Sequence, residues 1–341
     1  MRPWSPEYKG RLEELEITSQ ALEANPLGDS PRRPLLVYLP PGYGDDPARR
    51  YPSVYVLQGF FGAVPAWQKP SNNLRPSYIE MADELFASGG APPCVVVFVD
   101  AWTSLGGSQF VDSPATGRYH TYLCEDVVPF VDARYRTLAD AAHRGLQGKS
   151  SGGFGAMITA MLRPDLFGGL ATHAGDAYYE YCYLPMFPEV YRTLRDHYDS
   201  SFEAFFADMA TRPALSRRGD GDVLMTWAIS ACFSAEEDGT VKVPFELGTG
   251  RLDDAVWARW LEWDPVRMVP RHASALQSQR AIWVDAGRAD DYRLEIGAGA
   301  FVAELAGIGV DDVVFELFDG THAAIEYRYP LSLAYLAERL S

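Results

Sequence analysis

One short turn motif restricts the fold of this chain more than any other part of the sequence. The motif is G-x-S-x-G at residues 148–152, with Ser150 at its centre. Between a strand and a helix, this pattern forms a sharp turn that exposes the serine hydroxyl. Residues 143–147 have the character of a short buried strand, and the apolar run 154–162 has that of a buried helix. The sequence therefore predicts a strand–turn–helix unit that presents Ser150 as a nucleophile.

The two glycines of the motif have a mechanical role. A Cβ at Gly148 or Gly152 would collide with the neighbouring strand or helix, and the tight turn needs backbone angles that other residues adopt at a cost. The run Gly-Lys-Ser at 148–150 also resembles the end of a phosphate-binding loop. That loop needs a further glycine at the position of His143. The sequence therefore disfavours nucleotide binding here.

A serine hydroxyl is a weak nucleophile unless a base removes its proton. In folds with this turn the partners follow along the chain in the order serine, acid, histidine. Only His197, His272 and His322 lie well downstream of the motif. His322 follows the apolar-rich strand candidate 313–318, whereas His197 is surrounded by charged residues and reads as a surface position. We therefore expect His322 to be the base.

The acid is expected on the exit loop of the preceding strand. There it can accept from the imidazole, fix its tautomer and stabilise its protonated form. Residues 281–285 form a short apolar strand candidate, and Asp290 and Asp291 follow it. The 32 residues from Asp290 to His322 leave room for one helix and one strand. We favour Asp290 over Asp291 as the acid, and rank Asp285 third because it lies inside the strand.

The oxyanion of a tetrahedral intermediate needs two hydrogen-bond donors that are already in place. One is expected from the residue after the nucleophile and the other from the loop after an early strand. Residues 53–57 form such a strand, and it runs into a loop that contains Phe60. We therefore expect the backbone amides of Phe60 and Ser151 to form an oxyanion hole.

Further motifs carry a family resemblance. They are LVYLPPGY at 36–43, YPSVYVLQG at 51–59, CVVVFVD at 94–100, LCEDVVPFV at 123–131, PDLFG at 164–168, G-x-x-D at 287–290 and G-x-H at 320–322. Together with the serine motif, they resemble the esterase family of α/β-hydrolases. This family includes esterase D (S-formylglutathione hydrolase), feruloyl esterases, enterochelin esterases and mycolyltransferases. The resemblance covers roughly residues 10–175 and 278–341.

The resemblance implies an α/β-hydrolase fold, with a mostly parallel central sheet flanked by helices and a helical cap insertion. We expect an N-terminal arm at 1–34, the hydrolase core at 35–175 and 280–341, and the cap at 176–279. The insertion holds four of the eight tryptophans, at positions 227, 257, 260 and 263. These rings either form the interior of the cap or line a substrate pocket over the nucleophile, and the sequence leaves both interpretations open.

Three positions depart from the motifs that the family usually has. Gln58 stands where histidine or aspartate is common, and Lys149 and Ser151 replace leucine or histidine and methionine. Lys149 places a cation beside the nucleophile. We expect a substrate pocket that includes Gln58, Phe61, Lys149, Asp176 and Tyr178.

These expectations combine into a serine carboxylic-ester hydrolase that acts on a soluble small-molecule ester. Ser150 attacks the carbonyl, His322 transfers protons, Asp290 orients His322, and water releases the acyl group from Ser150. No metal and no organic cofactor are expected. The alternative is an acyltransferase that uses the same residues with an alcohol or sugar acceptor. A non-catalytic binding protein on the same fold is a weaker alternative.

Charge and composition exclude some partners. The chain has 46 acidic and 30 basic residues, a formal net charge of −16, which disfavours nucleic acid and anionic membranes. The start MRPWSPEYKG has no apolar run after its basic residue, and no stretch of about 18 apolar residues follows, so we expect a cytoplasmic protein that is not bound to a membrane. The four cysteines lack metal-ligand spacing. A homo-oligomer is left open.

Overall fold

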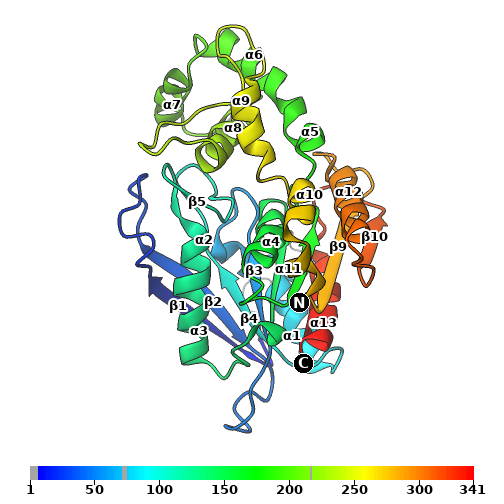
Figure 1. Ribbon diagram of the computed structural model, residues 1–341. Helices are drawn as coiled ribbons and strands as arrows, with labels where there is room; N and C mark the ends of the chain where they lie inside the picture. The colour runs from blue at the N-terminus through cyan, green and yellow to red at the C-terminus, as the bar shows by residue number, and fades with distance from the viewer. Residues whose placement is uncertain (1–6, 71–74, 216) are drawn as a thin grey trace.

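The computed structural model describes residues 7–70, 75–215 and 217–341 and is built around one large sheet (Figure 1). Its strands are β1 (Arg11–Thr18), β2 (Arg32–Leu39), β3 (Ser53–Leu57), β4 (Val95–Val99), β7 (Arg144–Lys149), β8 (Gly169–His173), β9 (Ala281–Gly287) and β10 (Val314–Phe318). The strand order is β1-β2-β4-β3-β7-β8-β9-β10. β2 is antiparallel to both of its neighbours, and all other neighbours are parallel. The expected mostly parallel sheet is confirmed.

Both faces of the sheet are apolar and covered by helices. In β4, Val97 belongs to one buried cluster and its neighbours Val96 and Phe98 belong to another. Such continuous buried runs are what a parallel sheet covered on both sides requires. The helices that supply side chains to the second cluster are α1 (Tyr78–Ala87) and α13 (Tyr329–Arg339), and those that supply the first include α4 (Ser151–Leu162) and α12 (Leu294–Gly307).

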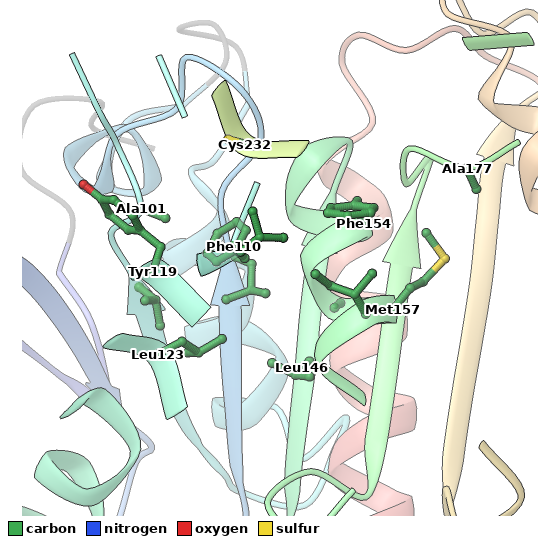
Figure 2. Close-up of a cluster of buried hydrophobic side chains, with 14 of the residues drawn as sticks. Ala101, Phe110, Tyr119, Leu123, Leu146, Phe154, Met157, Ala177 and Cys232 are labelled. Carbon is green, nitrogen blue, oxygen red and sulfur yellow. The ribbon is translucent and has the colours of Figure 1, made fainter. Parts of the chain in front are cut away.

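The larger cluster fixes the unit that carries Ser150. Figure 2 shows Leu146 of β7 beside Phe154 and Met157 of α4, with Tyr119 and Leu123 reaching in from neighbouring segments. Full burial of an apolar side chain of this size contributes about 1.5–3 kcal/mol, so this packing holds β7 and α4 firmly together. The remaining core elements are η1 (Val64–Gln68), β5 (Asp112–Ser113), β6 (Gly117–Arg118), α2 (Tyr119–Thr121), the π-helical turn η2 (Tyr122–Val127), α3 (Val128–Arg134), η3 (Ala141–His143) and η6 (Glu326–Arg328).

The chain between β8 and β9 is helical. It contains α5 (Tyr179–Cys182), η4 (Leu184–Met186), α6 (Phe187–His197), α7 (Phe202–Thr211), α8 (Asp220–Phe233), α9 (Asp254–Leu261), α10 (Pro265–Met268), η5 (Val269–His272) and α11 (Ala273–Gln277). In Figure 1, α6 to α9 stack above one end of the strands, whereas α10 and α11 run beside α4 and contact it. The segment 176–279 therefore divides between an upper helical group and the helical layer of the core. In the described ranges, no helix is long and apolar enough to cross a lipid bilayer.

The expected N-terminal arm at 1–34 is wrong at residues 11–18 and 32–34, which are strands of the sheet. β1 lies inside this range and pairs with β2 from Arg11 opposite Leu39 to Thr18 opposite Arg32. The sequence of β1, RLEELEIT, mixes charged and apolar residues. Because β1 is the edge strand of the sheet, its exposed charged residues, Arg11, Glu14 and Glu16, protect the edge from pairing with other chains, whereas the half-buried Glu13 accepts from the Tyr135 hydroxyl at 2.6 Å. The charge that suggested an arm belongs to an edge strand.

Candidate active site

Ser150 lies at the turn between β7 and α4. Its backbone angles, φ 55° and ψ −128°, are strained for a residue with a side chain. Its amide donates to the carbonyl oxygens of His173 at 3.0 Å and Ala174 at 3.1 Å, and its own carbonyl accepts from Phe154 at 2.8 Å. These bonds hold the serine in a conformation that persists only where the surroundings enforce it.

The glycines of the motif allow close backbone contacts. A Cβ on Gly148 would lie 2.2 Å from the carbonyl oxygen of Gly152, and one on Gly152 would lie 2.2 Å from that of Leu57. Neither clash could be relieved by moving a side chain. α4 therefore approaches the end of β3, which brings the following loop to the nucleophile. A Cβ on Gly59 in that loop would lie only 3.5 Å from the Cβ of Ser150.

His322 and Asp290 are brought together after β10 and β9. Nδ1 of His322 lies 2.8 Å from Oδ2 of Asp290, which leaves Nε2 free to act as a base. Asp290 also accepts from the amides of Tyr292 at 2.8 Å and Leu294 at 3.4 Å, and its side chain is fully buried. Asp291 instead accepts from the backbone amide of His322 at 3.3 Å. The carboxylate that faces the ring is therefore that of Asp290.

The other candidates for base and acid lie elsewhere. His197 is exposed at the end of α6, and His272 lies where α11 begins. Asp285 contacts Nδ1 of His173 at 2.6 Å, and Nε2 of that ring contacts Oγ of Ser332 at 2.7 Å. These three residues form a second Ser–His–Asp arrangement, but each of them is fully buried and no substrate can reach them. Its members lie too far apart in the sequence to form a motif.

A cavity of about 390 Å³ lies over Ser150. Phe61, Lys149 and Asp176 line it, as expected from the sequence. The complete lining is Gly59, Phe60, Phe61, Gly62, Lys149, Ser150, Ser151, Asp176, Cys182, Tyr183, Met186, Gly221, Asp222, Met225, Tyr292, Leu294, His322 and Tyr329. The cavity therefore has walls from the core and from α5, η4 and α8 of the helical segment.

Gln58 and Tyr178, expected in the pocket, are not part of this lining. The Gln58 amide donates to the carbonyl of Gly62 at 2.5 Å, so its side chain closes its own loop. Tyr178 has a left-handed backbone, with φ 59°, and its amide donates to Asp264 at 2.9 Å. Its ring packs on Tyr181, with 4.9 Å between the centroids. In both cases the local turn, which the motif does not specify, decides where the side chain points.

Asp176 contacts Ser150 itself. Its Oδ1 lies 3.4 Å from Oγ of Ser150, and its Oδ2 lies 3.1 Å from Oγ of Ser151. Oδ2 also accepts from the Tyr183 hydroxyl at 2.7 Å and the Gln109 amide at 3.3 Å. All these partners are neutral, and burial raises the pKa of Asp176. Among the described residues, Asp176 is the hydrogen-bond partner of the Ser150 hydroxyl, which must therefore rotate to reach His322.

Two residues that line the cavity have a backbone amide with no protein acceptor among the described residues. The amide of Ser151 is at the first turn of α4, where helix amides lack intrahelical partners. The amide of Phe60 lies in the loop after β3, which is fixed by the bond from Phe61 N to Gly106 O at 3.0 Å. Both residues line the cavity. Free, fixed donors beside a nucleophile are suited to holding an oxyanion.

The charges of the cavity are mixed. Burial lowers the pKa of Lys149, and the nearby carboxylates of Glu326 and Asp290 oppose this effect. Asp176 and Asp222 add acidic groups to the wall. In the part of the chain that the structure describes, no three His, Cys, Asp or Glu residues gather in a way that could hold a metal ion.

Apart from Asp176, sequence reasoning did not anticipate the side chains that the helical segment contributes. None of the insertion's four tryptophans lines the cavity. Trp260 is fully buried and packs on Phe187, with ring centroids 5.5 Å apart. The cavity instead receives Met186 and Met225. Their position depends on how the helices pack, so the sequence holds no local signal for it.

Comparison with known proteins identifies similar chains. Residues 30–308, well over half of the chain, match the family model described as "Putative esterase". An endo-1,4-beta-xylanase/feruloyl esterase of Xylanibacter ruminicola is 26% identical over 145 residues, which cover 42% of this chain and 19% of that protein. The chain spans less than two thirds of the first three curated relatives that it matches, at 19%, 58% and 32% of their lengths.

Solved structures agree on the fold. A ferulic acid esterase superposes with a TM-score of 0.62 at 19% identity, covering 98% of this chain and 100% of that one. An S-formylglutathione hydrolase from Agrobacterium tumefaciens superposes with a TM-score of 0.56 at 17% identity, covering 99% and 98%. These neighbours share the α/β-hydrolase fold with this chain.

Proposed function

Because the chain belongs to the esterase family whose model spans residues 30–308, we propose that it is a serine carboxylic-ester hydrolase acting on small-molecule esters. One observation carries the proposal. His322, whose Nδ1 lies 2.8 Å from Asp290, lines the same cavity as Ser150. An exposed nucleophile, a base with a free ring nitrogen and a buried carboxylate that orients the base are the parts that acyl transfer through serine needs.

In the first half of the reaction, the Ser150 hydroxyl turns from Asp176 to Nε2 of His322 and attacks the ester carbonyl carbon. His322 takes the hydroxyl proton, and Asp290 stabilises the charged ring. The negative charge that develops on the carbonyl oxygen is held by the amides of Phe60 and Ser151. The bond to the alcohol then breaks, His322 gives its proton to the leaving oxygen, and the acyl group stays on Ser150.

Water completes the reaction by the same route. His322 takes a proton from a water molecule, the resulting hydroxide attacks the acyl carbon, and the proton returns to Oγ of Ser150 as the acid leaves. We assign the segment 176–279 the role of a cap, because part of it closes the cavity. Its apolar contributions, Cys182, Met186 and Met225, provide a surface for the acyl or alcohol group.

Hydrolysis of p-nitrophenyl acetate and butyrate by wild type, Ser150→Ala and Ser104→Ala tests the proposal. Ser104 is an exposed serine away from the cavity and serves as the matched control. We expect Ser150→Ala to lose about 10³-fold or more in kcat/KM with an unchanged Tm, and Ser104→Ala to match wild type. Retention of more than about a tenth of the activity in Ser150→Ala would contradict the mechanism. Added alcohols that divert most of the acyl group from water would instead favour an acyltransferase.

A further inference from the structure

The loop that carries His322 is held differently in its two halves. It leaves β10 at Phe318, and this first half is tied to the loop after β9 by bonds from Arg288 N to Phe318 O at 2.8 Å and from Ala289 N to Gly320 O at 3.0 Å. The second half, residues 323–327, makes no such backbone bond to the sheet among the described residues. Within it Ile325 packs into the apolar core, and Arg328 supplies the charged anchor at its far end.

Arg328 is the polar anchor at that end. Its Nε donates to Oδ2 of Asp285 on β9 at 3.0 Å, and its terminal nitrogen pairs with Glu316 on β10. The side chain is buried, with its guanidinium 4.7 Å from the centre of the Phe318 ring. The planar guanidinium of an arginine can pair with two carboxylates at once. A lysine ammonium, on a flexible side chain, cannot reproduce this geometry.

Asp285 is itself held in place. Its carboxylate contacts Nδ1 of His173 at 2.6 Å and accepts from the Trp283 ring at 2.9 Å. Burial alone would raise the pKa of Asp285, but His173, Trp283 and Arg328 together hold it below its ordinary value. Arg328 is therefore fixed to an ionised carboxylate that cannot easily move, and a buried charge pair of this kind is costly to break on one side only.

The same network reaches the segment that carries the nucleophile. The amide nitrogen of Gln147 on β7 donates to Oγ of Ser332 at 2.5 Å and to the carbonyl of Tyr329 at 2.9 Å. Ser332 in turn contacts Nε2 of His173 at 2.7 Å. Gln147 lies three residues before Ser150. The buried network beneath the cavity thus joins the three segments that carry Ser150, the acid and the base.

We propose that Arg328 is a positioning residue for His322. Its guanidinium, paired with Asp285 and Glu316, fixes the far end of the loop. The imidazole of His322 therefore keeps its contact with Asp290 and stays close enough to act on Ser150. This inference rests on the proposed ester hydrolysis. It assigns a catalytic consequence to Arg328, Asp285 and Glu316, none of which lines the cavity over Ser150.

Arg328→Lys tests this inference because it keeps the positive charge but loses the planar guanidinium that pairs with two carboxylates. We expect kcat for p-nitrophenyl butyrate to fall about 10–100-fold, since a misplacement of about 1 Å can cost 10²-fold, while KM changes less than about threefold. Arg339→Lys is the control, because Arg339 forms an exposed pair with Asp312. We expect it to behave as wild type. All rates are measured well below the Tm of each variant.

Kinetics per reactive site separate positioning from mere stability. Asp290, Asp291, Asp176 and the Tyr292 ring lie around His322, and Lys149 lines the same cavity; none of them changes in the variant. Titration with a fluorophosphonate counts the chains that carry a reactive serine, so a loss of folded protein lowers the count and leaves kcat per titrated site unchanged. An unchanged kcat per titrated site, or a rise in KM that accounts for the whole loss, overturns the inference.

Glu316→Gln provides the second variant if Arg328→Lys fails to fold. Glu316 has a half-exposed side chain, so its loss is tolerable, and it removes one of the two anchors. We expect kcat per titrated site to fall about 2–5-fold while KM changes less than about threefold. A wild-type kcat per titrated site overturns the inference. Ser150→Ala distinguishes the failures: an active Ser150→Ala rejects the proposed function, whereas an inactive one beside a normal Arg328→Lys rejects only the positioning role.

Discussion

Asp290 and Asp176 both contact a reacting group, but their surroundings differ. Asp290 accepts from two backbone amides as well as facing the ring of His322, and these partners stabilise its charge. Asp176 accepts only from neutral side chains and is 5% exposed, so its charge is unfavourable in the folded state. A buried carboxylate kept at such a cost beside the nucleophile is typical of a functional site.

The acid assignment predicts unequal effects of two adjacent substitutions. Asp290→Asn should lower kcat about 10³–10⁴-fold, because an amide favours the wrong tautomer of His322. Asp291→Asn should change kcat less than about tenfold, since its carboxylate meets the backbone amide of His322 rather than the ring. Steady-state kinetics on one ester measures both. Equal losses in the two variants would contradict the assignment.

Replacing Asp176 with asparagine should stabilise the folded protein, and this gain in stability should grow as the pH rises. Its folded-state pKa is raised, so the folded protein holds this proton more tightly than the unfolded chain, where an aspartate titrates near about 3.9. The contribution of Asp176 to stability therefore falls as pH rises from the unfolded pKa through the folded one. Asp176→Asn removes this penalty. The Tm of the variant minus that of wild type should become more positive as pH rises from about 4, near the unfolded pKa, to neutral, and a constant or falling difference would show that the carboxyl is not penalised.

At the scale of elements, local signals predicted the parts that carry the chemistry. β7 with the turn at Ser150 and α4, and the exits of β9 and β10, follow from short motifs between apolar runs. The edge strand β1 was missed because its charges suit a solvent-facing edge as well as an arm. Gln58 and Tyr178 were wrongly expected in the cavity because turn geometry sets side-chain direction independently of position in the motif.

Substitutions at the two methionines that the helical segment contributes to the cavity should change which acyl groups the protein prefers. Met186→Phe or Met225→Phe should narrow the cavity, so kcat/KM for p-nitrophenyl octanoate should fall about tenfold or more relative to the acetate. Trp227→Phe is the control, because Trp227 packs on Phe202 with ring centroids 4.8 Å apart and does not line the cavity. The ratio of kcat/KM between the two esters is the readout. A uniform loss across esters would mean that these methionines do not contact the acyl group.

At the scale of the whole molecule, the parallel sheet gathers residues that the sequence separates. Ser150, Asp290 and His322 could be expected at one edge because the parallel strands β7, β9 and β10, which precede them, end there. The contact of Asp176 with Ser150 and the anchoring of Arg328 could not, because both depend on how segments far apart in the chain pack against each other. Sequence patterns specify which residues reach the edge of the sheet, and packing specifies which of them touch.

The most direct test of the central claim, that Ser150 is the nucleophile activated by His322, is covalent labelling with a fluorophosphonate followed by mass spectrometry. We predict one adduct per chain, on the peptide that contains Ser150, no adduct in Ser150→Ala, and labelling slowed by several orders of magnitude in His322→Ala. An adduct at any other residue, or labelling of Ser150→Ala at the wild-type rate, would contradict the account.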